Sequence, residues 1–132
     1  MDHRWIGLRA ALAIHDLQIV EHGGADGLRD MALLESALAR PHHLLAYGTP
    51  DIAELAASYA DGISRNHPFV DGNKRTAWLL AVTFLDLNGY DVDAEMAGAL
   101  QAMLSLAAGT LSEEDFAAWL RERPRKFDGA SG

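Results

Sequence analysis

Apolar residues recur along most of this chain at spacings of three and four, which is the period of helices that bury one face. Glycine, proline and short polar stretches separate these segments at positions where helices begin and end. The pattern predicts six helices, over residues 4–22, 30–40, 50–65, 72–88, 94–107 and 112–124. No segment alternates with the period of a strand, so the expected fold class is all-α.

Three of the predicted helices carry capping signals. Asp30 is a favoured N-cap for the second helix, and Ser112 followed by Asp115 resembles a capping box for the sixth. Thr49 before Pro50 predicts a cap and a proline at the first position of the third. Residues 41–48 have no helical period and follow the predicted end of the second helix, so they are expected to form an exposed connection.

The segment 72–88 differs from the others because it is apolar nearly all the way round. Such a helix is usually buried on all sides. We therefore expect a single compact bundle of about six helices around this central helix. The domain should cover residues 1–126, and residues 127–132, which carry no structural signal, should form a flexible tail.

Composition narrows the possible functions of the chain. Its 132 residues carry a formal net charge of −8 and no cysteine. The acidic balance disfavours nucleic-acid and anionic membrane partners, and the lack of cysteine excludes disulfides and thiolate metal sites. No apolar stretch approaches the ~20 residues that span a bilayer. We expect a soluble cytoplasmic protein without a secretory leader.

The polar residues that begin the central helix have the chemistry of a phosphate site. A helix N-terminus offers free N–H groups and a partial positive charge, and Gly72 permits close approach of a ligand to the backbone. Lys74 and Arg75 add positive charge. Asp71 is a suitable Mg²⁺ ligand, and His67 suits a general base because histidine as a residue type exchanges protons near neutral pH.

The same residues also fit a purely structural role. Asp71 is a common helix cap, and Gly72 with Asn73 is a common turn. Lys74 and Arg75 also fit a solvated surface pair. Spacing alone does not decide between these alternatives.

The run HPFVDGNKRTAW at residues 67–78 resembles the signature of the Fic/Doc family, His-x-Phe-x-Asp-Gly-Asn followed by basic residues. EHGG at 21–24 and LLESALARP at 33–41 resemble its death-on-curing (Doc) branch, and the similarity extends over roughly residues 5 to 120. Fic proteins continue the signature as Gly-Asn-Gly-Arg-x-x-Arg and transfer AMP from ATP. Here Lys74 replaces the second glycine and Trp78 replaces the second arginine, as in Doc.

The resemblance implies an ATP- and Mg²⁺-dependent toxin that phosphorylates a threonine of elongation factor Tu and so stops translation. It assigns His67 as the general base and Asp71 as the Mg²⁺ ligand. Gly72 and Asn73 would hold a phosphate, while Lys74 and Arg75 would both bind the nucleotide and stabilise the transferring group. Phe69 and Pro68 would be structural.

Two alternatives to the kinase remain open, namely AMP transfer of the Fic type and a non-enzymatic module that binds an antitoxin. The resemblance implies an antitoxin partner whose C-terminal segment folds as a helix in a groove of this protein. It also suggests that residues 41–47 belong to a target-docking flap. His42 and His43 are a further, weaker candidate for a metal site.

Overall fold

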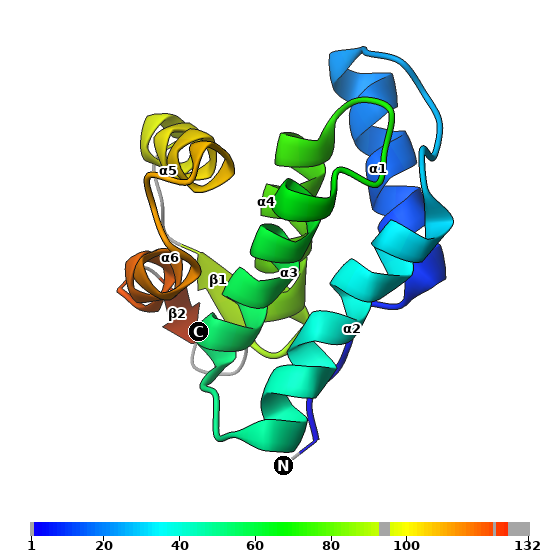
Figure 1. The fold of residues 1–132 in the computed structure, drawn as a ribbon. Coiled ribbons are helices and arrows are strands. Elements are labelled where there is room, and N and C mark those ends of the chain that lie inside the picture. The colour runs from blue at the N-terminus through cyan, green and yellow to red at the C-terminus, as the bar shows by residue number, and fades with distance from the viewer. Residues whose placement is uncertain (1, 93–95, 123, 127–132) are drawn as a thin grey trace.

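The computed structural model of the chain describes residues 2–92, 96–122 and 124–126. The described residues form six helices and one pair of short strands (Figure 1). The helices are α1 (Leu8–His22), α2 (Met31–Tyr47), α3 (Ile52–Asn66), α4 (Asn73–Leu87), α5 (Met96–Ala108) and α6 (Glu113–Arg121). The antiparallel strands are β1 (Tyr90–Val92) and β2 (Pro124–Lys126).

The predicted all-α class is confirmed. The structure also contains a pair of strands that the sequence pattern did not predict. Each strand has only three residues, too few to show the alternation of polar and apolar residues that is typical of a strand. Within the described residues, no helix is both long and apolar enough to cross a membrane. The predicted tail, residues 127–132, lies outside the described part of the chain.

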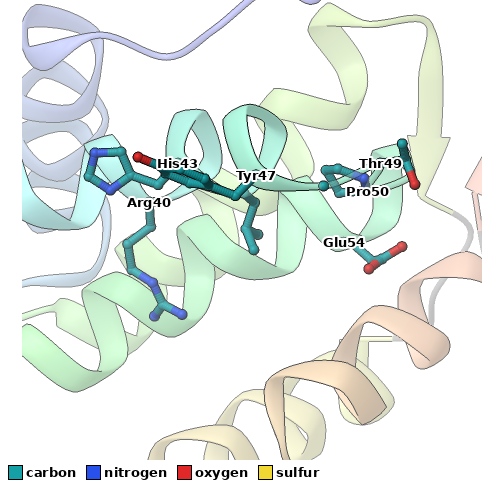
Figure 2. Close-up of a pocket in the computed structure, with 8 residues that line it drawn as sticks. Arg40, His43, Tyr47, Thr49, Pro50 and Glu54 are labelled. Atoms are coloured by element: carbon teal, nitrogen blue, oxygen red, sulfur yellow. The ribbon is translucent and has the colours of Figure 1, made fainter.

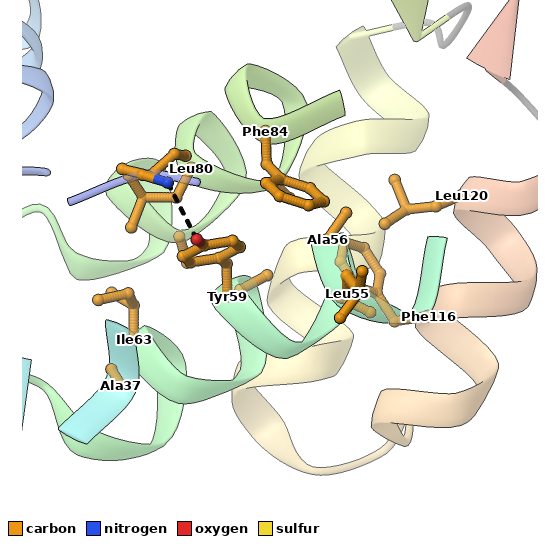
Figure 3. Close-up of a cluster of buried hydrophobic side chains, with 14 of the residues drawn as sticks. Ala37, Leu55, Ala56, Tyr59, Ile63, Leu80, Phe84, Phe116 and Leu120 are labelled. Atoms are coloured by element: carbon orange, nitrogen blue, oxygen red, sulfur yellow. Dashed lines mark hydrogen bonds between the residues drawn. The ribbon is translucent and has the colours of Figure 1, made fainter. Parts of the chain in front are cut away.

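α3 occupies the centre of the bundle, where it packs against α2, α4, α5 and α6. Its residues 55–64 are buried without interruption. Figure 3 shows the core around it, where Tyr59 and Ile63 of α3 meet Leu80 and Phe84 of α4. α4 was expected to be the central helix, but it buries only one face, and its side toward Trp78 and Leu79 is half-buried.

The predicted start of the first helix at residue 4 is wrong by one turn. Residues 2–7 have no regular secondary structure, and tertiary contacts hold this segment against the core. The buried Ile6 donates its backbone N–H to the Tyr59 hydroxyl at 3.0 Å, the dashed line in Figure 3. The backbone N–H and C=O of Arg4 pair with the side-chain amide of Asn88.

The prediction that the second helix stops before Pro41 is also wrong, because α2 continues through Pro41 to Tyr47. A proline inside a helix loses one hydrogen bond and costs roughly 3 kcal/mol. Pro41 is itself buried, on the same face of α2 as Ala37 and Leu38. Gly62 of α3 brings the two helices close, since a Cβ there would lie 3.1 Å from the Ala37 Cα. Tight packing of this face against α3 offsets the lost bond.

The capping predictions had mixed outcomes. Asp30 and Ser112 cap α2 and α6 as predicted, each accepting a backbone N–H three residues on. Thr49 and Pro50 do not start α3, which begins after Asp51. Asp51 and Glu54 form a complete capping box, and this satisfies two of the first N–H groups of α3.

Candidate active site

The predicted site lies in the loop of residues 67–72 that joins α3 to α4. His67 ends α3 with a left-handed backbone (φ 47°) and donates its N–H to the Ile63 carbonyl. Among the described non-glycine residues it alone has positive φ, a conformation uncommon for a histidine. Its side chain is exposed and forms no hydrogen bond or ion pair with the described residues. The ring is therefore free to exchange a proton with a ligand.

Phe69 anchors the loop in the core, as expected. Its ring is 1% exposed and stacks on the ring of His15 from α1, with centroids 3.8 Å apart and planes 4° from parallel. Asn73 fixes its backbone, because the Asn73 amide accepts the Phe69 N–H at 3.0 Å and donates to the Phe69 carbonyl at 2.9 Å. Asn73 is buried, so in this structure its amide shapes the loop.

A second segment, residues 24–30, clamps the loop from outside. Arg29 donates from Nε to the His67 carbonyl at 2.7 Å and from Nη2 to the Asn66 carbonyl at 2.8 Å. Its backbone N–H and that of Asp30 both reach the Pro68 carbonyl. A positive guanidinium on the last carbonyls of α3 is also favoured by the helix dipole. Sequence reasoning missed Arg29, which lies 38 positions from His67 and carries no local signal.

Asp71 presents an exposed carboxylate at the mouth of the loop. Its oxygens accept the backbone N–H groups of Ala25 at 3.1 Å and Gly72 at 2.8 Å. These two bonds hold the pKa of Asp71 below its ordinary value. The group is therefore ionised at neutral pH, and each oxygen retains a lone pair for a cation. This donor set fits Mg²⁺, which commonly takes one protein carboxylate together with phosphate and water oxygens.

The N-terminus of α4 is open. Gly72 stands at the N-cap position with φ 78°, and no side chain caps the helix. The first helix-type bond runs from the Thr76 N–H to the Gly72 carbonyl. The N–H groups of residues 73–75 have no partner among the described residues. A Cβ on Gly72 would lie 2.0 Å from Nε2 of Gln18, so a larger residue would have to displace that side chain as well as adopt a positive φ.

Lys74 and Arg75 lie on this open first turn. Both side chains are exposed and make no hydrogen bond or ion pair with the described residues. Arg75 is close enough to Asp71 to help lower the pKa of that carboxyl. Five of the six predicted site residues are thus exposed or partly exposed along the loop 67–72 and the first turn of α4, namely His67, Asp71, Gly72, Lys74 and Arg75. Asn73 is buried.

Comparison with known proteins identifies the family of the chain. Residues 5–85 match the Fic/DOC family, and the site lies within that range. The chain belongs to the Fic/DOC family. It is 43% identical over 79 residues to the protein named Toxin Doc from Mycolicibacterium smegmatis, an alignment that covers 58% of this chain and 60% of that protein. It is 37% identical over 90 residues to Protein kinase doc from Escherichia phage P1, covering 67% of this chain and 71% of that protein.

A surface cavity of about 700 Å³ lies away from this Fic/DOC motif. Figure 2 shows its lining, which comes from the end of α2, the connection after it and the first turn of α3. The motif follows the last turn of α3, about 20 Å away along a helix of 15 residues. Residues 41–47, expected to form an irregular flap, are helical and lie at this distant end.

The histidine pair at 42 and 43 does not form a metal centre with the described residues. The His42 ring packs on Trp5 with centroids 4.2 Å apart, and His43 lines the cavity. Among the described residues, neither belongs to a group of three side chains able to hold an ion. The segment that does lie alongside the motif is residues 24–30, where Leu28 forms a β-bridge with Phe69.

Proposed function

We propose that the chain is the toxin of a toxin–antitoxin pair and acts as a protein kinase. It would transfer the γ-phosphoryl group of ATP to a hydroxyl of a cytoplasmic translation protein, with a threonine of elongation factor Tu as the first candidate. The observation that carries the proposal is the uncapped start of α4, flanked by the Asp71 carboxylate and two unpaired cations. Similarity to a protein named as a kinase supports the reaction type.

His67 is the proposed general base. As the target hydroxyl oxygen attacks the γ-phosphorus, its proton passes to the imidazole. The new O–P bond forms while the bond from the γ-phosphorus to the bridging oxygen breaks, and ADP leaves with that oxygen. The His67 ring makes no hydrogen bond with the described residues, which supports this role. Ring nitrogens already bonded to other side chains would be less able to contact the target hydroxyl and accept its proton.

The remaining residues would position the nucleotide and neutralise charge, which is most of what phosphoryl transfer requires. The free N–H groups at the start of α4 suit phosphate oxygens, with Gly72 allowing their close approach. Lys74 and Arg75 would stabilise the charge on the transferring group. Asp71 would hold Mg²⁺, which supplies charge neutralisation to the phosphates. Asn73 would act mainly by holding the backbone at Phe69.

Two positions favour phosphorylation over AMP transfer. Lys74 puts a long cation where Fic proteins have a glycine. Trp78, where they have a second arginine, packs edge-on against Trp119 of α6 with ring centroids 5.9 Å apart. Position 78 is thus engaged in packing α4 against α6, and one phosphate-binding cation of the AMP-transferring enzymes is missing. AMP transfer is the alternative that the experiment below separates.

The proposal includes a cognate antitoxin, whose C-terminal segment we expect to bind as a helix in a groove of this protein. The name of the mycobacterial relative supports a toxin role. A non-enzymatic binding module would share this partner, so partner binding alone does not test the kinase. The test has to follow the phosphoryl group.

The purified protein should be incubated with Mg²⁺, elongation factor Tu and ATP labelled at either the α- or the γ-phosphate. We expect γ-label on a threonine and a mass gain of one phosphoryl group. His67→Asn is the best inactive variant, because asparagine tolerates the left-handed backbone at this position and should keep the loop intact. It should lower the rate about 100-fold or more.

His43→Asn is the matched control, an exposed histidine at the far end of the bundle, and should retain full activity. Label from the α-phosphate would replace the kinase by AMP transfer. Growth inhibition that persists unchanged in His67→Asn would support the binding module instead.

A further inference from the structure

His15 of α1 lies directly behind the active-site loop and is 2% exposed. Its Nε2 is 2.7 Å from the carbonyl oxygen of Asp71. Because a carbonyl only accepts hydrogen bonds, Nε2 carries a hydrogen, and in the neutral ring Nδ1 then presents a lone pair. Nδ1 makes no hydrogen bond with the described residues, and Oδ1 of Asp16 lies 3.9 Å from it, which is an ion-pair distance if the ring is protonated.

Two carboxylates lie near the His15 ring. Asp16 follows His15 on α1, and Asp26 comes from the segment 24–30 that clamps the loop. One ligand atom from each of the three residues lies within 4.8 Å of the other two. Neither carboxylate makes a hydrogen bond with the described residues, and both are exposed. Three possible ligand atoms thus lie close together, and two of them belong to carboxylates, an arrangement that a cation would stabilise.

We propose that His15, Asp16 and Asp26 bind a divalent transition-metal ion such as Zn²⁺, with water completing the coordination. One imidazole and two carboxylates suit such an ion. Ligand atoms around a tetrahedral Zn²⁺ lie about 3.4 Å apart, so the two exposed aspartates would have to rotate to bring the three ligand atoms to this spacing. The Nε2–H bond to a backbone carbonyl matches the way in which metal-binding histidines are usually held.

The site would couple metal binding to the active-site loop. An ion shared by His15 and Asp26 links α1 to the segment 24–30, whose Ala25 N–H holds the Asp71 carboxylate. It also makes the Nε2–H of His15 a stronger donor to the Asp71 carbonyl. The ion stabilises this arrangement and takes no part in phosphoryl transfer, so the site does not depend on the proposed kinase activity.

Calorimetric titration of Zn²⁺ into the untagged protein tests the site, together with the thermal midpoint of unfolding. We expect binding at one site and a rise in the midpoint with Zn²⁺. Asp26→Asn should weaken the Zn²⁺ affinity by about 10-fold or more. Loss of a residue that only hydrogen-bonds a metal ligand already costs about 10-fold, and loss of a ligand should cost at least as much. Asp26 is exposed, so this variant should fold.

Two controls locate the ion. Asp86→Asn changes an exposed aspartate on α4 that lies apart from the cluster, and should leave Zn²⁺ affinity unchanged. Asp71→Asn removes the proposed Mg²⁺ ligand but keeps an oxygen that can accept the Ala25 N–H, so it should weaken Zn²⁺ binding much less than Asp26→Asn does. If Asp71→Asn abolishes binding while Asp26→Asn does not, the ion sits in the active site and the proposal fails.

Nitrogen NMR of the His15 ring gives a readout independent of affinity. Zn²⁺ should shift Nδ1 while Nε2 keeps its hydrogen in both states. A ring that carries hydrogen on both nitrogens throughout the titration would show that a proton, and not a metal ion, stabilises the two carboxylates. That result would overturn the proposal.

Discussion

The starts of α3 and α4 solve the same problem in opposite ways. Every helix begins with N–H groups that have no partner within the helix. At α3, Asp51 accepts the Glu54 N–H at 2.8 Å and Glu54 accepts the Asp51 N–H at 3.1 Å, while Arg121 donates to Asp51 at 2.6 Å. At α4, Gly72 offers no cap, and the N–H groups of residues 73–75 have no described partner.

The cations near the two helices differ in the same way. Arg121 is neutralised by Asp51, with Glu54 nearby, whereas Lys74 and Arg75 make no hydrogen bond or close ion pair with the described residues, and Arg75 acts on Asp71 only from a greater distance. A capped start contributes to stability and offers nothing to an anion. An open start gives up that stability and keeps its donors and charge for a ligand. The comparison therefore predicts that changes at α4 affect activity first, and changes at α3 affect stability alone.

Replacing the free arginine should have the largest effect. Arg75→Ala should slow phosphoryl transfer about 1,000-fold, because it removes a charge that stabilises the transferring group. The free energy of unfolding should stay within about 0.5 kcal/mol of wild type, since the side chain is exposed and unpaired. Initial rates with γ-labelled ATP and urea unfolding measure the two quantities.

Arg121→Ala should give the reverse result. It removes a surface ion pair worth at most about 1 kcal/mol and leaves transfer unchanged. If both arginine variants lose activity equally, the contrast between the two helix starts does not explain function.

The glycine at the open start should have an intermediate effect. Gly72→Ala must place a Cβ at φ 78°, against Nε2 of Gln18, and should lower the free energy of unfolding by about 2 kcal/mol. Gly109→Ala is a matched control, with φ 81° and nothing within 4 Å of the added Cβ, so it carries the backbone strain alone. Chemical unfolding should show the smaller loss for Gly109→Ala. Equal losses would mean that Gln18 simply moves aside.

Much of this contrast is local and was therefore predictable from the sequence. A cap lies within three residues of the bonds it makes, so Asp30 and Ser112 were found, and the motif residues lie within nine positions of one another. Asp51 and Glu54 carry the same local signal. It was missed because Thr49 and Pro50, two residues earlier, gave a competing signal for the same helix start.

The parts of the site that come from elsewhere in the chain were not predictable. His15 reaches the Asp71 carbonyl across 56 positions, and Gln18 reaches the Gly72 carbonyl across 54. Partners this far apart leave no spacing pattern in one sequence. The prediction that the second helix ends before Pro41 was wrong for a related reason. The packing of α2 against α3 keeps this residue helical, and local helix propensity carries no information about that packing.

Substitutions of Asp51, which caps the start of α3, should have the smallest effect on stability. The pH dependence of that effect provides a further test. Asp51→Ala should cost about 1 kcal/mol of unfolding free energy, and Asp51→Asn less, because asparagine still accepts the Glu54 N–H. Burial alone would raise the pKa of Asp51, but the hydrogen bonds from Arg121 and the Glu54 N–H outweigh it and hold the pKa below its ordinary value.

A carboxyl whose pKa is lower in the folded state stabilises the fold above its unfolded pKa, about 3.9 for aspartate. That contribution is lost as the pH falls through the folded pKa. Urea unfolding of wild type and Asp51→Asn between about pH 6 and pH 2 should therefore show a gap that closes in acid. A gap that stays constant over this range would mean that the charge of Asp51 adds nothing to its cap. The closed start of α3 would then differ from the open start of α4 only in hydrogen bonding.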